Sequence, residues 1–80
     1  MNQDNLYSVI AIITPGIIQY LMDDRGVNEE TAAELLYNSY LYSKLEDEKT
    51  KLWHLSPLTL FDLLNEELTT GIITWPEEQA

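Results

Sequence analysis

The feature that most constrains the fold is an uncharged apolar run near the N-terminus, Val9–Ile18, which reads VIAIITPGII. A membrane-spanning helix needs about 20 apolar residues, so we expect this shorter run to be buried in a core or an interface. The residues before it include Asp4 and no Lys or Arg, whereas a secretory signal begins with basic residues. We therefore expect a cytoplasmic protein with no membrane segment.

A helix from about Asn5 to Met22 is predicted to contain this run. Its apolar residues recur at spacings of three and four, as on one helix face: Leu6, Val9, Ile10, Ile13, Ile17 and Leu21. Pro15 removes an amide donor and crowds the preceding turn, whereas Thr14 is suited to cap a new helix. Two alternatives stay open, a helix kinked at Thr14–Pro15 or two short helices that restart there.

A second helix is predicted after a turn that ends at Gly26. Asn28 is a suitable N-cap, and Glu29 and Glu30 would lie in the first turn, where the helix dipole favours negative charge. The expected core face comprises Ala32, Leu35, Leu36, Ser39, Tyr40 and either Leu41 or Tyr42. The charged segment Leu45–Lys51 is expected to be a solvated helix end or loop.

The third predicted helix has the sharpest start, with Ser56 as N-cap and Pro57 at the first helical position. Its apolar stripe is Leu60, Phe61, Leu64 and Leu68. Gly71 should end it, and Ile72–Trp75 reads as a short extended segment. That segment could pair with Leu52–His54, pair with a second chain, or lie unpaired across the helices.

Together these elements predict an all-α fold, a small bundle of three to four helices. Residues 1–76 should form one helical domain, and residues 77–80 a disordered tail. The chain has 80 residues and no cysteine, so neither disulfides nor thiolate-bound metal can supplement its small core. We therefore expect additional stability from oligomerisation or from docking on another protein, and we expect no cofactor.

The charge of the chain restricts its partners. Fourteen acidic residues against four basic ones give a formal net charge of -10. Such a surface should repel nucleic acid and an anionic bilayer. A basic protein is the natural complement, although the same charge could serve only to keep a small protein soluble.

Few catalytic sites can be assembled from this sequence. His54 is the only histidine and cysteine is absent, so one chain cannot build a two-histidine metal site or a Cys/His pair. Acidic pairs such as Glu66 and Glu67 are adjacent, and adjacent helix positions do not face each other. We predict no enzyme activity and no catalytic, cofactor-binding or metal-ligating residue. The alternative is a small ligand-binding or carboxylate-based enzyme domain.

The aromatic and apolar residues are the candidates for protein contact. Three tyrosines lie within six positions of one predicted helix and cannot all face one core, whereas the two tryptophans flank the third helix. Each could instead pack in the core. The candidate interface comprises Ile12, Ile13, Ile17, Ile18, Tyr37, Tyr40, Tyr42, Trp53 and Trp75. We expect a homodimer with Val9–Ile18 in or next to its interface.

Two segments carry a resemblance, LLYNSYLYSKLEDEKTKLWHLSP at Leu35–Pro57 and LLNEELTTGIITWPEE at Leu63–Glu78. They resemble a group of small, uncharacterised bacterial helical proteins, and cover the second half of the chain better than the first. The resemblance implies an association with toxin-like genes and transfers no catalytic residue. The function we expect is therefore that of a small acidic protein-interaction or regulatory protein, antitoxin-like in kind.

Overall fold

The structure of the chain is a computed structural model that describes residues 3–75. Within these residues it contains four α-helices, two short 3-10 helices and no strand. The elements are α1 (Gln3–Arg25), α2 (Glu29–Tyr37), α3 (Tyr40–Leu45), η1 (Glu48–Thr50), η2 (Leu52–His54) and α4 (Pro57–Thr70). The predicted all-α bundle is thus confirmed, whereas the predicted tail at residues 77–80 lies outside the described residues.

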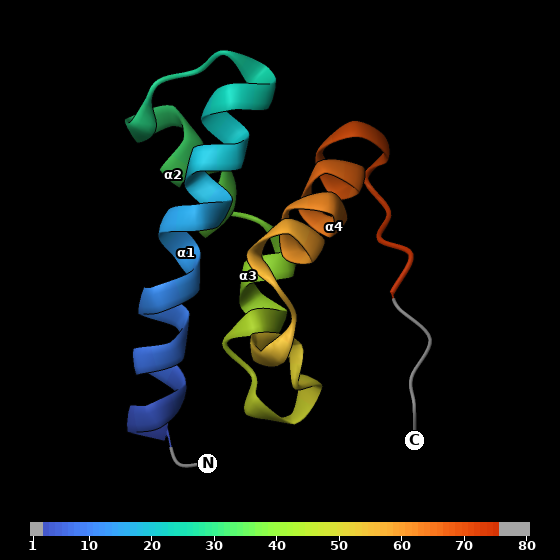
Figure 1. The fold of residues 1–80 in the computed structure, drawn as a ribbon. Helices are drawn as coiled ribbons and strands as arrows, with labels where there is room; N and C mark the ends of the chain where they lie inside the picture. The colour runs from blue at the N-terminus through green and yellow to red at the C-terminus, as the bar shows by residue number, and fades with distance from the viewer. Residues whose placement is uncertain (1–2, 76–80) are drawn as a thin grey trace.

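The longest element, α1, lies along one side of the bundle (Figure 1) and packs most extensively against α4 and α2. It continues through Pro15 without interruption, so the alternative of a second helix restarting at Thr14 does not form. The hydrogen bond that Pro15 cannot make would reach the carbonyl of Ala11. Both residues lie on the exposed side of α1, where water can satisfy that carbonyl.

A close approach of α4 to α1 depends on Gly16. A Cβ atom placed at Gly16 would lie 3.1 Å from the Cβ of Pro57, at the start of α4. That distance is shorter than ordinary van der Waals contact, so even a methyl group at this position would require Pro57 to shift by a few tenths of an ångström. Gly16 therefore serves packing between helices as well as lowering the intrinsic stability of α1.

The prediction of one helix through Asn28–Tyr42 was wrong, because the chain breaks between α2 and α3. Asn38 ends α2, and Ser39 adopts an extended backbone with φ −82° and ψ 156°. The Ser39 hydroxyl donates to the Leu36 carbonyl at 2.6 Å and accepts from the Tyr42 amide at 3.0 Å. The buried Ser39 thus bonds to the last turn of α2 and also caps the start of α3. The break places Tyr40 on the surface instead of in the predicted core.

The first helix extends beyond its predicted end at Met22 to Arg25, so only Gly26 of the expected turn lies after it, whereas the predicted start of α2 and both predicted ends of α4 are confirmed. The Asn28 side chain accepts from the Thr31 amide at 2.8 Å, and Gly26 adopts a positive φ of 67°. Ser56 accepts from the Thr59 amide at 3.1 Å at the start of α4. Gly71, with φ 81°, ends that helix, and its amide donates to the Glu67 carbonyl.

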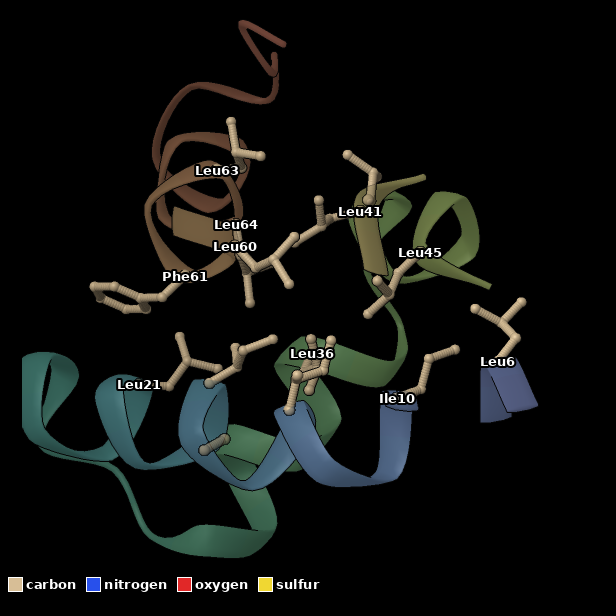
Figure 2. Packing of buried hydrophobic residues seen from close by; sticks show 14 residues of the cluster. Leu6, Ile10, Leu21, Leu36, Leu41, Leu45, Leu60, Phe61, Leu63 and Leu64 are labelled. Atoms are coloured by element: carbon tan, nitrogen blue, oxygen red, sulfur yellow. The ribbon is translucent and has the colours of Figure 1, made fainter. Parts of the chain in front are cut away.

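All four helices contribute to one hydrophobic core (Figure 2). Its largest fully buried side chains are Leu6, Ile17, Leu21, Leu36, Leu41, Leu45, Leu60 and Leu64. In Figure 2 the side chains of α1 face those of α3 and α4 across the core. The apolar stripe predicted for α4 is buried at Leu60, Phe61 and Leu64 and half-buried at Leu68. The core thus joins elements that lie far apart in the sequence.

One stretch of α1, Asn5–Arg25, is long and apolar enough to cross a membrane by length and composition alone. This stretch is longer than the run Val9–Ile18, which by itself is too short to span a membrane, because uncharged residues flank that run on both sides. The core helix of a soluble protein passes the same test. In this fold α1 contributes one face to the core that it shares with the other three helices.

Candidate interaction surfaces

The structure divides the predicted interface residues of α1 between the core and the surface. Ile13 and Ile17 are buried in the core, which corrects their assignment to an interface, because neither side chain can reach a partner. Ile18 is half-buried against the core. Ile12 lies on the opposite side of the helix, with 76% of its surface exposed. Of the predicted interface residues on α1, Ile12 is therefore the one whose side chain is available to a partner.

A second surface is formed by two aromatic rings far apart in the sequence. Tyr40 begins α3 and is 54% exposed, and Trp75 follows α4 and is 39% exposed. Their ring centroids are 6.3 Å apart and the planes are tilted by 54°. The Lys44 ammonium lies 5.1 Å from the centroid of the Tyr40 ring. We call this pair of rings the Tyr40–Trp75 surface.

Glu67 positions the Tyr40 side of this surface. Its carboxylate accepts hydrogen bonds from the main-chain amides of Tyr40, at 2.7 Å, and Leu41, at 2.9 Å. These are the first two amides of α3, which have no partner within the helix. The helix dipole also favours a negatively charged carboxylate at this end of α3. Glu67 therefore attaches the start of α3 to the last turns of α4.

Glu66 positions the Trp75 side. Its two carboxylate oxygens accept from the main-chain amide of Thr74, at 2.9 Å, and from the Thr74 hydroxyl, at 2.8 Å. These bonds hold the pKa of Glu66 below the usual range of a glutamate, and the bond from the amide has a larger effect than the bond from the hydroxyl. The segment after Gly71 runs along the side of α4 away from α1 (Figure 1).

The structure excludes one of the alternatives for the C-terminal segment. Leu52–His54 forms the 3-10 helix η2, so the suggested strand pairing with Ile72–Trp75 was wrong. Within the described residues the segment has no strand partner. A carboxylate side chain, rather than a second strand, satisfies the amide of Thr74.

A separate cluster at the junction of α1, α2 and α3 contains Tyr7, Tyr37 and Tyr42. The rings of Tyr37 and Tyr42 meet edge to face, with centroids 4.9 Å apart. Burial chiefly raises the pKa of Tyr42, and nearby Glu46, Tyr37 and Tyr7 raise it further. Tyr42 is half-buried, whereas Tyr37 and Tyr7 are exposed. This cluster therefore combines packing with partial exposure.

Trp53 belongs to the loop before α4 rather than to either aromatic surface. It is half-buried, and its indole N–H donates to the Glu48 carbonyl at 3.3 Å. Its ring meets His54 edge to face, with centroids 5.6 Å apart. These contacts tie η2 to η1, so packing within the loop accounts for the position of Trp53.

A cleft of about 330 Å³ lies between α2 and α4. It is lined by Thr31, Glu34, Leu35, Asn38, Ser39, Glu67 and Leu68. The Glu67 carboxylate there is already bonded to two main-chain amides. Among residues 3–75, no three His, Cys, Asp or Glu side chains are grouped so that they could hold a metal ion.

Comparison of the chain with protein families, curated proteins and solved structures finds no match. The resemblance to small bacterial helical proteins therefore stays a prediction. A helical fold by itself does not define a function; function depends on the residues that the fold presents at its surface.

Proposed function

We propose that this chain is a small acidic protein-interaction or regulatory protein that binds a protein partner at the Tyr40–Trp75 surface. The observation that carries the proposal is that two exposed aromatic rings from distant segments are brought into contact and positioned by Glu66 and Glu67. Tyr and Trp side chains are enriched at protein interfaces and among the residues that dominate binding energy. Their exposure here leaves broad apolar area available for a partner.

The partner that fits this surface is basic. The chain has a net charge of -10, which attracts a basic protein at long range and accelerates its association. Within the chain the Tyr40 ring already lies under the Lys44 ammonium, a geometry in which aromatic rings attract cations. A partner's Lys or Arg can contact the exposed rings in the same way.

The particular role that we propose is that of a cytoplasmic regulatory subunit, of the antitoxin-like kind implied by the resemblance, and not that of an enzyme. Two contacts support this choice. The carboxylates of Glu66 and Glu67 are bonded to main-chain amides, and the exposed His54 packs beside Trp53. Each of these groups thus has a structural explanation that involves no substrate.

Affinity capture from the native lysate tests the proposal, with the wild-type chain, the double variant Tyr40→Ala/Trp75→Ala and the control Tyr37→Ala as baits. Tyr37 is suited as a control because it is 48% exposed but belongs to the other tyrosine cluster. We expect a basic protein to be retained by wild type and Tyr37→Ala, lost with the double variant, and released by salt. Equal recovery with all three baits would contradict the proposal.

A further inference from the structure

The outer face of α1 is exposed and carries no charge. Opposite the buried stripe, exposed residues recur at helical spacing, namely Ser8, Ala11, Ile12, Pro15 and Gln19, and these five define the α1 outer face. Ile12 lies midway along the helix and, at 76%, is the most exposed of the large apolar side chains in the described part of the chain. A single exposed apolar residue needs no explanation, so its surroundings matter.

Half-exposed uncharged side chains border this face on both sides. Toward α2 lie Tyr7 and Tyr37, both near Tyr42. Toward α4 lies Tyr20, whose ring centroid is 5.5 Å from that of Phe61. Leu58 is also exposed on α4, directly after the proline that approaches Gly16. Of the eight exposed large apolar or aromatic side chains, Tyr7, Ile12 and Tyr20 thus lie on α1 itself, and Tyr37 and Leu58 lie on the two helices that pack most extensively against it.

The charge distribution indicates what can cover this face. From Asn5 to Met22 there is no Asp, Glu, Lys or Arg, in a chain whose net charge is -10. Two copies of the chain repel each other over surfaces that carry carboxylates, and burying an unpaired carboxylate is costly. The α1 outer face itself carries none; Gln19, at one end of the face, donates a hydrogen bond to the Asp23 carboxylate at 3.0 Å, so two copies can meet around Ile12 without burying a carboxylate. The same net charge disfavours an anionic bilayer as the occupant.

We propose that two copies of the chain associate through their α1 outer faces, with Ile12 near the two-fold axis. A two-fold dimer places the same patch of each copy against itself, so the patch must not repel a second copy of itself. An uncharged patch meets this condition. Ser8 and Ala11 are small enough to let two helices approach closely. This interface is separate from the Tyr40–Trp75 surface and does not depend on the proposed function.

Two exposed isoleucines provide a matched pair of variants to test the dimer. Ile12→Glu places a carboxylate in the proposed interface, whereas Ile72→Glu makes the same change at a side chain that is 68% exposed near the end of α4. Sedimentation equilibrium at tens of micromolar, at low and high salt, measures association of each variant and of wild type. Far-UV circular dichroism checks that both variants keep the helical fold.

We expect wild type and Ile72→Glu to form dimers that tighten with salt, because salt screens the repulsion between acidic copies. Ile12→Glu should weaken association by about tenfold or more while still capturing any partner of the Tyr40–Trp75 surface. A wild-type monomer at both salt concentrations would overturn the proposal, as would equal weakening by the two variants. A monomer that binds phosphatidylcholine vesicles would assign the face to a membrane instead.

Discussion

Replacing Glu67 by alanine tests whether one carboxylate organises the junction of α3 and α4. The change removes hydrogen bonds from the Tyr40 and Leu41 amides, at 2.7 and 2.9 Å. A hydrogen bond to a charged group contributes about 1.5–3 kcal/mol when water cannot replace it. Leu41 is buried and Tyr40 is exposed, so water can replace only the Tyr40 bond. We therefore expect Glu67→Ala to lower the free energy of unfolding by about 1.5–3 kcal/mol.

Urea unfolding followed by far-UV circular dichroism measures this loss. For a chain of this size a slope of about 1 kcal/mol per M converts the loss into a midpoint lowered by about 1.5–3 M. The neighbouring variant Glu66→Ala is the matched control, because Glu66 bonds only to the exposed Thr74. A Glu67→Ala midpoint equal to that of Glu66→Ala would refute the inferred role of Glu67 at the start of α3.

Three further outcomes are expected. Ser56→Ala should cost about 0.5–2 kcal/mol in urea, because the N-cap of α4 is lost, and an unchanged midpoint would contradict that cap. Gly71→Ala should cost about 1–2 kcal/mol, since an L-residue is strained at a positive φ, and a neutral effect on thermal unfolding would argue against it. The pKa of Glu66 is lowered by its bonds to the C-terminal segment, so its contribution is complete above about pH 4.3, the ordinary glutamate value, and is lost as the pH falls through the lowered value. Emission of Trp75 in a Trp53→Phe background should change as Glu66 is protonated, and emission that stays constant in acid until the whole chain unfolds would exclude the separate release of the segment.

The sequence alone determined the class of fold and most helix boundaries, because the signals involved are local. A cap needs only a side chain within three residues of the amide that it satisfies. For that reason Asn28, Ser56 and Gly71 could be assigned before any packing was known. The helical spacing likewise identified a buried face that the structure confirms at Leu6, Ile10, Ile13, Ile17 and Leu21, whereas Val9, predicted with them, is only half-buried. No interface residue was determined in this way.

Tertiary structure decided which side chains reach the surface. Ile12 and Ile13 were both candidates for an interface because both are apolar, and the packing of the helices buries Ile13 and leaves Ile12 exposed. Ser39 read as part of a helix because nothing local showed that its hydroxyl would bond to Leu36 and Tyr42.

The two adjacent glutamates of α4 show the same limit most directly. Their partners lie 26 and 27 residues earlier for Glu67, and eight residues later for Glu66. Spacing along one helix predicts interactions only with positions three or four residues away. The contact that joins α3, α4 and the C-terminal segment therefore exists only in the folded chain, where segments distant in sequence are held side by side by a shared core.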